Sequence, residues 1–558
     1  MATTARVEMA RGEPKHPVSL LLAMVWMVII GIGTLFLATQ VFQIEAFFNL
    51  GTFVPQFLGI VLGLVGILSL VTVPFLWTLN NNWRIVALIM NFFGLGFGIL
   101  YTGHVSGMFL GIDTLALNIY RNAWLLLGFP IGYVLVWISG RMDDLNSAKD
   151  IVQKIGLAVM GVALIAILLT SGWLQYVAEN PGAGLGQIFN LPTIATVAVT
   201  IIFGVVGSIF MRNGELFGET ILEREAWQGW LFLLPNFVNF LLFFAMPLIL
   251  SFYLSFTDYN AISRADWIGF DNYRRLLSLD FETVPTGTAP TDLADRHFEV
   301  SRFTVGANDI VIAAESPGFW RTLATTFRYC ILLLTFAIVP AFALAMLLNA
   351  KIPGIKFFRA VYFLPSIAAV VGVAMIWQWL YNPIIGFINY WISGFVDVLN
   401  GLGLAVSDPN IQWLTDENVM LLSVVIMAAW QVIGFNTVIL LAGLQGVPKD
   451  LIEASTVDGA NSWIRFRRII LPLLGPTTFF VVVTTLISGM QAFSEMYTLF
   501  GVSTSDARLT VVYYLYLSGF QQFDMGFASA TAWVLFVVIF IITVIQFRVS
   551  RSSEAYRD

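Results

Sequence analysis

Long apolar runs recur along the chain, separated by short polar segments. A transmembrane helix needs about 20 apolar residues, whereas the strands of a membrane β-barrel alternate in polarity and give no such runs. The pattern therefore predicts twelve membrane-spanning helices, six on either side of an acidic patch at 215–225. The first begins at Val18, and the others are 56–78, 85–103, 122–139, 155–175, 191–211, 229–256, 322–349, 358–381, 418–444, 469–492 and 527–547.

The polar segments between these runs predict an orientation. If residue 1 lies in the cytosol, almost all lysines and arginines of the short segments fall on the cytoplasmic side, as the positive-inside rule requires. The short outer segments then hold only Arg121 and Arg508. We therefore expect cytoplasmic N- and C-termini and a cytoplasmic position for the segment 447–468.

Composition supports a membrane protein and narrows its chemistry. Of 558 residues, 58% are hydrophobic and 11% are charged, and the mean hydropathy is +0.83, which no soluble domain shows. The single cysteine, Cys330, excludes an intrachain disulfide, and His16, His104 and His297 lie in separate segments. We expect no metal site and no nucleic-acid partner.

Motifs of nucleotide-binding and hydrolytic enzymes are missing from the sequence. There is no GxxxxGK[ST] phosphate loop, and no HExxH, paired CxxC or GxSxG motif. Asp143 and Asp144 resemble half of a metal–nucleotide site, but a solvated loop explains them better than a membrane-embedded transferase. We expect a transport subunit that is not an enzyme and binds no cofactor.

The most densely charged pattern of the C-terminal half lies between Pro448 and Pro476. Apolar residues at helical spacing flank Gly459, so the segment predicts two short helices that meet at a bend, where glycine supplies a positive φ. Its apolar face either packs on the neighbouring spans or is covered by a partner protein.

Glu453, Ala454 and Ser455, then Asp458-Gly459-Ala460 and Ile469-Ile470-Leu471-Pro472, resemble the EAA loop of binding-protein-dependent ABC transporter permeases. The similarity is greatest to the carbohydrate-uptake, maltose-type branch. In that family the loop docks on a separate ATPase subunit and transmits ATP-driven closure. The resemblance implies a coupling role for the following residues: Pro448, Glu453, Ala454, Asp458, Gly459, Ala460 and Pro472.

Other motifs extend this resemblance to residues 229–548. They are Trp267-Ile268-Gly269-Phe270-Asp271-Asn272-Tyr273, Arg359-Ala360-Val361-Tyr362-Phe363-Leu364-Pro365, Trp377-Gln378-Trp379, Gln412-Trp413-Leu414, Trp430-Gln431 and Phe523-Asp524-Met525-Gly526. The resemblance implies an all-α fold with a six-helix type I importer core.

It also implies partners, namely a second permease, two ATPase subunits that hold ATP and Mg, and an extracytoplasmic solute-binding protein. The setting would be a bacterial or archaeal cytoplasmic membrane.

A sugar permease needs amides, carboxylates and stacking aromatics along its pathway, and polar residues within spans are costly enough to suggest function. Such residues either line the pathway or bond a neighbouring helix. The predicted substrate-binding residues are Trp430, Gln431, Asn436, Ser488, Gln491 and Glu495. Which sugar they would bind is left open.

Two parts of the chain have open roles. Residues 1–228 form an N-terminal extension that could be a packing platform, a lipid-facing stabiliser or an interaction module. The external loop 257–321 contains two β-forming pieces, 298–305 and 309–314, and is either a small folded cap that contacts a binding protein or a mobile loop.

The six-plus-six layout also fits an ion-coupled secondary transporter. That class predicts similar halves and ionisable residues in the membrane, whereas no internal repeat is visible here and only Arg328 and Glu495 lie in or beside span interiors.

Overall fold

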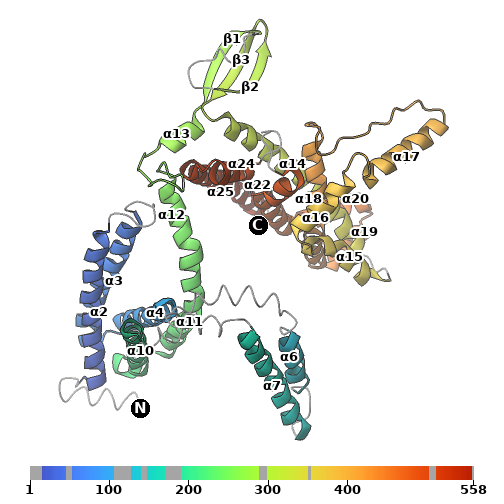
Figure 1. The fold of residues 1–558 in the computed structure, drawn as a ribbon. Helices are drawn as coiled ribbons and strands as arrows, with labels where there is room; N and C mark the ends of the chain where they lie inside the picture. The colour runs from blue at the N-terminus through green and yellow to red at the C-terminus, as the bar shows by residue number, and fades with distance from the viewer. Residues whose placement is uncertain are drawn as a thin grey trace. The chain divides into compact units, whose positions relative to one another are not determined.

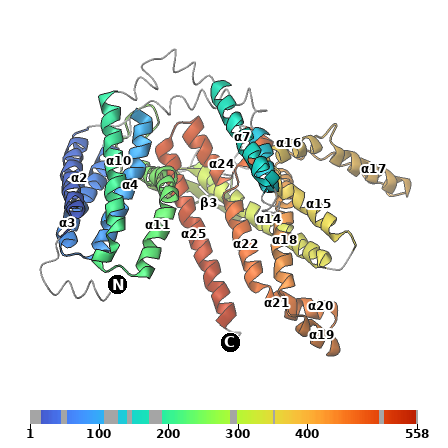
Figure 2. The same cartoon turned by 90° about the horizontal axis from the view of Figure 1, so that it is seen from below.

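The computed structural model describes residues 16–44, 53–105, 127–139, 147–170, 190–287, 298–349, 353–501 and 510–555. These residues are mostly helical, as predicted (Figures 1 and 2). The chain divides into two compact units between Pro247 and Leu248. The boundary expected after residue 228 falls inside helix α11 (Ile221–Phe240).

Pairs of apolar helices build the first unit. The helix α2 packs along α3, α4 packs along α10, and α6 packs along α7. Close approach of α2 and α3 depends on Gly66, where an added Cβ would lie 2.9 Å from the carbonyl oxygen of Gly31. The bounds are α2 (Val18–Phe42), α3 (Phe53–Trp77), α4 (Asn81–Val105), α6 (Gly128–Ser139), α7 (Ser147–Thr170), α10 (Leu191–Arg212) and η2 (Gly214–Phe217).

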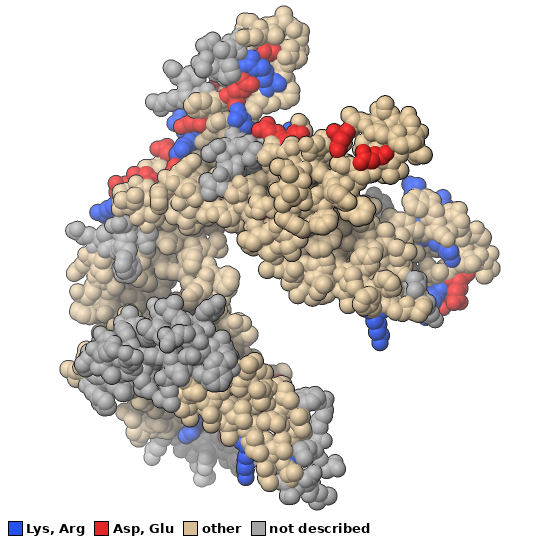
Figure 3. Space-filling view, turned by 45° about the vertical axis from the view of Figure 1, so that its right-hand side comes forward, with Lys and Arg blue, Asp and Glu red and all other residues tan. Residues whose placement is uncertain are grey.

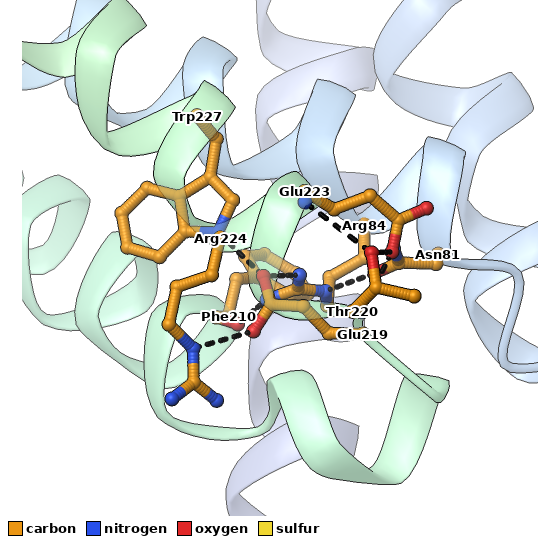
Figure 4. Close-up of polar contacts among 8 residues, drawn as sticks. All are labelled: Asn81, Arg84, Phe210, Glu219, Thr220, Glu223, Arg224 and Trp227. Carbon is orange, nitrogen blue, oxygen red and sulfur yellow. Dashed lines mark hydrogen bonds and ion pairs between the residues drawn. The ribbon is translucent and has the colours of Figure 1, made fainter.

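A buried ionic cluster joins α4, α10 and α11 (Figure 4). The Arg84 guanidinium donates to the Phe210 carbonyl at 2.8 Å and to the Glu219 carboxylate at 2.5 Å, and both charged side chains are fully buried. Arg224 and Trp227 also donate to Glu219. Burial alone would raise the pKa of Glu219, but the hydrogen bonds from Trp227 and Arg84 hold it below its ordinary value. The cluster fixes the turn before α11.

The second unit follows α11 through a π-helical turn, η3 (Leu241–Ala245). Its central span is α18, with 61% of its apolar window buried. The remaining bounds are α12 (Met246–Leu254), α13 (Asp271–Leu277), β1 (Asp280–Pro285), β2 (Phe298–Val305), β3 (Asn308–Ala314), α14 (Pro317–Leu348), α15 (Ile355–Ile367), α16 (Val370–Leu380), α17 (Phe387–Gly401), α18 (Met420–Gln445), α19 (Lys449–Val457), α20 (Ser462–Arg465), η5 (Phe466–Ile470), α21 (Leu471–Leu473), α22 (Gly475–Met490), α23 (Ser494–Phe500), α24 (Val511–Tyr516), η7 (Leu517–Gln521) and α25 (Met525–Ala555).

The loop 257–321 contains a three-stranded antiparallel sheet in the order β1-β3-β2. Strands β2 and β3 confirm the two predicted β-forming pieces, whereas β1 was not predicted. Arg302 bonds Glu299 at 2.7 Å and Asp309 at 3.0 Å, and so ties β2 to β3. Figure 3 shows charges of both signs on the sheet and a largely uncharged surface over the neighbouring helices. The loop is therefore a folded cap.

The described residues account for part of the predicted number of spans. The described residues contain eight single helices long and apolar enough to cross a membrane, or up to ten if each of two bent pairs is one span. Of the two predicted spans outside this count, 122–139 is described only from residue 127 onward, where the 12 residues of α6 reach about 18 Å. The run 155–175 falls in α7, which contains a shorter apolar stretch at Ile151–Ala163, and residues 171–189 lie outside the described part. Twelve spans are not confirmed.

Two spans predicted as continuous helices are bent. The run 358–381 breaks between α15 and α16 at an angle of 98°, and the run 469–492 bends by 72° before α22. At the first break Ala368 and Ala369 are extended, with ψ of 141° and 128°. Apolar length alone carries no sign of such a break, because the apolar run continues through it.

Candidate functional site

The predicted helix–glycine–helix unit is present after α18. Helix α19 ends at Val457, Asp458 is its C-cap, and Gly459 follows with a φ of +77°. The Ala460 amide donates to the Ser455 carbonyl at 2.9 Å and the Gly459 amide to the Thr456 carbonyl at 3.1 Å. These two bonds form a Schellman motif, which requires a left-handed residue at the glycine position. The bend is therefore built into the sequence at Gly459.

Side chains fix the second arm of the bend. Asn461 accepts a hydrogen bond from the Ile464 amide at 2.8 Å and so caps α20. Arg465 donates to Thr456 at 2.9 Å, across the glycine, and to Ser462 at 3.2 Å. One guanidinium therefore holds both arms at a fixed angle.

The loop contacts the helices through Phe466 and leaves two large apolar side chains exposed. The Phe466 ring contacts the Phe342 ring of α14 at 6.3 Å between centroids. Val457 and Trp463, by contrast, are 89% and 65% exposed, and Figure 2 shows α19 and α20 beyond the ends of α18 and α22. The neighbouring spans of the described chain therefore leave these two apolar side chains uncovered.

The structure gathers the predicted coupling residues at this end of the molecule. Glu453 and Ala454 lie exposed on α19. Pro472 is in α21, half-buried at the start of the bent span. The other members flank the first helix and the bend: Pro448, Asp458, Gly459 and Ala460.

Two predicted pathway residues bond neighbouring helices. The Gln431 amide donates to the Ala368 carbonyl at 2.9 Å, and so satisfies the oxygen freed where the α15–α16 span breaks. The Asn436 amide donates to the Thr485 hydroxyl at 3.2 Å, from α18 to α22. Both side chains are nearly fully buried.

The remaining four pathway candidates are more open. Trp430 is 44% exposed and meets the Trp377 ring edge-on at 5.8 Å. Ser488 and Gln491 are exposed at the C-terminal end of α22, and Glu495 is half-buried in the first turn of α23. An aromatic face, a hydroxyl, an amide and a carboxylate are the groups that sugar binding requires.

A polar junction at the base of the sheet was not predicted as a site. The Asn272 amide donates to the Ser255 and Thr257 carbonyls at 3.0 and 2.8 Å. A Cβ at Gly526 would lie 2.1 Å from that same Thr257 oxygen. Arg275 bonds Asp524 at 2.9 Å. The WIGFDNY and FDMG segments therefore meet, and only their shared family resemblance could have signalled it.

Within the described residues, no group of three or more histidine, cysteine or acidic side chains is placed to hold a metal ion.

Comparison with known proteins shows which family the second unit resembles. Residues 311–554 match the family model of the binding-protein-dependent transport system inner membrane component. The chain is 29% identical to the probable ABC transporter permease protein YesP of Bacillus subtilis over 333 residues, covering 59% of this chain and 92% of the relative.

Two further relatives are more similar over shorter lengths. The chain is 33% identical to the arabinooligosaccharides transport system permease protein AraP of Halalkalibacterium halodurans, covering 41% of this chain and 71% of the relative. It is 31% identical to the sn-glycerol-3-phosphate transport system permease protein UgpA of Agrobacterium fabrum, covering 45% and 82%.

The relative UgpA is 31% identical and is covered over most of its length. The helix–glycine–helix loop that the family resemblance predicted is also present in the structure. The chain belongs to the binding-protein-dependent ABC transporter permeases of the carbohydrate-uptake type.

Proposed function

We propose that this protein is one of two permease subunits of an ATP-driven importer of neutral oligosaccharides. The observation that carries the coupling part of the proposal is the exposed helix–glycine–helix unit at the end of α18. A docking element needs a fixed shape and an uncovered apolar face, and α19–α20 has both, through Arg465 and through Val457 and Trp463.

In this proposal the loop seats in a separate ATPase subunit, which holds ATP and Mg. Glu453 and Ala454 face that subunit from α19, and Gly459 sets the angle of the second arm. Pro472 begins the bent span, so a push on the loop is passed to α22 through α20, η5 and α21. Two ATPase copies and a second permease complete the assembly.

Four residues are proposed to contact the solute directly. Trp430 would stack on a sugar face, and Ser488, Gln491 and Glu495 would bond hydroxyl groups. Gln431 and Asn436 are proposed to act indirectly, by positioning α18. Their amides hold α18 against the α15–α16 break and against α22.

The charge of this set supports a neutral solute. The six predicted residues include one carboxylate, Glu495, and no cation. A phosphate group would be repelled by that carboxylate and would need arginine or lysine partners. Oligosaccharides, as in the name of the AraP relative, therefore fit this set better than glycerol phosphate.

The folded sheet and the polar junction below it are proposed as the contact for an extracytoplasmic solute-binding protein. This proposal rests on topology. The spans between the sheet and α19 place them on opposite sides of the membrane, and the basic residues near α19 favour the cytosol for that helix. Both termini would then be cytoplasmic, in the inner membrane of a prokaryote.

Uptake into proteoliposomes tests this proposal. The complete transporter, with its binding protein outside the vesicles, should accumulate labelled oligosaccharide only when ATP is enclosed in the vesicle lumen, which corresponds to the cytoplasm. Excess glycerol 3-phosphate should not compete with the oligosaccharide for uptake. Uptake driven by a proton or sodium gradient without ATP would overturn the proposal in favour of a secondary transporter. Competition by glycerol 3-phosphate would overturn the neutral-solute part alone.

A further inference from the structure

Helix α17 carries a continuous apolar stripe that the permease motifs do not explain. Large apolar side chains recur at helical spacing along one face, each between 49% and 75% exposed. They are Phe387, Tyr390, Trp391, Phe395, Val398 and Leu402. Gly394 completes the same face, and Asp397, the one charged residue of α17, lies at its edge. Such a face needs a partner.

The opposite face of α17 is already occupied by the chain itself. Asn389 donates to the Ile411 carbonyl at 2.9 Å and accepts from the Trp413 indole at 2.8 Å. Asn400 donates to the Val406 carbonyl at 3.0 Å and accepts from the Val406 amide at 2.7 Å. The segment 404–413 therefore satisfies the polar side of α17, and only the apolar stripe is left open.

The position of α17 relative to the spans limits what its apolar stripe can contact. Six residues separate the start of the helix from Leu380, the last residue of the bent pair α15–α16. Figure 2 shows it crosswise to α22 and projecting from the second unit, as Figure 1 also shows. It precedes α18 whereas α19 follows, so α17 and the coupling loop lie at opposite ends of that span.

The stripe also continues an apolar surface of the span. The Phe387 ring contacts the Trp379 ring of α16 at 5.5 Å. Met375 and Ile376, one turn before Trp379, are 60% and 61% exposed. The apolar surface of α16, one arm of the bent pair α15–α16, therefore runs without a charged side chain onto α17, with aromatic residues at the change of direction.

We propose that α17 is an interfacial helix whose apolar stripe lies in the headgroup region of the leaflet opposite the coupling loop. A helix crosswise to the spans, with one apolar face and with tyrosine and tryptophan on it, matches the requirements of that region. Lipid, rather than a second protein, accounts for the continuity with α16. The helix thereby holds the end of α16 and the start of α18 at a fixed depth.

Fluorescent labelling of single cysteines tests the depth of α17. Cys330, the single cysteine, is replaced by serine, and cysteine is then introduced as Val398→Cys or Leu402→Cys on the stripe. Ser407→Cys, exposed on the segment that covers the polar side, is the matched control. Each variant is labelled with an environment-sensitive dye and reconstituted, with its partner subunits, into vesicles that carry nitroxide lipids.

The stripe labels should be blue-shifted and quenched severalfold more strongly than Ser407→Cys by lipids with a shallow nitroxide, and less strongly by lipids with a nitroxide deep in the acyl chain. Two outcomes would overturn the proposal. Blue-shifted labels that lipid quenchers do not reach would show a protein partner, and labels quenched by aqueous iodide would show a face in water. The readout is independent of which solute the transporter carries.

Discussion

Gly459 combines a left-handed backbone with an open surface. Its φ is +77° and an added Cβ would meet no atom within 4 Å, so a substitution acts through backbone strain alone. Gly459→Val should therefore uncouple ATP hydrolysis from transport, because a β-branched residue costs about 1–2 kcal/mol in that conformation. The measurement is substrate-stimulated ATPase activity of the reconstituted complex.

Gly459→Asn is the control for that variant, because asparagine tolerates the left-handed region. It should retain most of the coupling. Equal loss in Gly459→Asn and Gly459→Val would show that the side chain, not the backbone angle, matters at this position.

Glu219 neutralises a buried charge in the first unit. Glu219→Gln would leave the Arg84 guanidinium buried without a counter-charge, which costs about 3–5 kcal/mol. The exposed neighbour Glu215→Gln should change stability little. Thermal unfolding of the detergent-solubilised protein compares the two, and similar midpoints would contradict a structural role for the cluster.

The same carboxylate predicts a pH dependence. Because the pKa of Glu219 is lowered from its ordinary value of 4.5, its contribution to stability is present above pH 4.5 and is lost as the pH falls through the lowered pKa. The stability gap between the wild type and Glu219→Gln should therefore narrow on acidification from pH 7 to below pH 4.5. A constant gap would count against this ionic contribution.

Sequence pattern predicted some of these residues and not others. The bend at Gly459 was predictable because a glycine between two amphipathic stretches is typical of a turn with a positive φ. The structural partners of Gln431 and Asn436 were not, because a polar residue within an apolar run looks the same whether it faces a solute or a carbonyl on the next helix. Only the packing of α18 distinguishes the two cases.

At the scale of elements, the bent span depends on contact between α15 and α18. A Cβ at Gly434 would lie 2.2 Å from the Tyr362 carbonyl oxygen, whereas at Gly372 of α16 it would meet nothing within 4 Å. Gly434→Ala should lower the free energy of unfolding by about 1–3 kcal/mol. Gly372→Ala should leave it unchanged or raise it by up to about 1 kcal/mol.

Thermal unfolding in detergent measures both variants. A destabilised Gly372→Ala with an unaffected Gly434→Ala would contradict the observed packing of α15 against α18.

The elements themselves were predictable where apolar length is the signal. Spans such as α14 and α18, and the β-forming pieces of the cap, appear where expected. The breaks in α15–α16 and before α22 were not predicted, since the apolar runs 358–381 and 469–492 continue through them. Strand β1 and helix α17 were missed because each lies in a segment that was treated as a polar connection.

At the scale of the whole molecule, the sequence separated a permease core from an N-terminal extension, and the structure has two compact units. Eight to ten of the twelve predicted spans are present in the described residues, and the other two predicted runs, 122–139 and 155–175, are described only in part. No motif in the sequence indicates a role for the first unit. Its buried ionic cluster accounts for the stability of the unit and does not indicate a chemical activity.

The central claim is that α19 and α20 bind a separate ATPase. Affinity purification of the tagged chain from its native membrane, in mild detergent, tests it directly, with wild type, Gly459→Asn and Gly459→Arg compared by mass spectrometry. The account predicts a P-loop ATPase with wild type and Gly459→Asn, and a reduced amount or none with Gly459→Arg. The absence of any ATPase from all three samples, or equal amounts in all three, would contradict it.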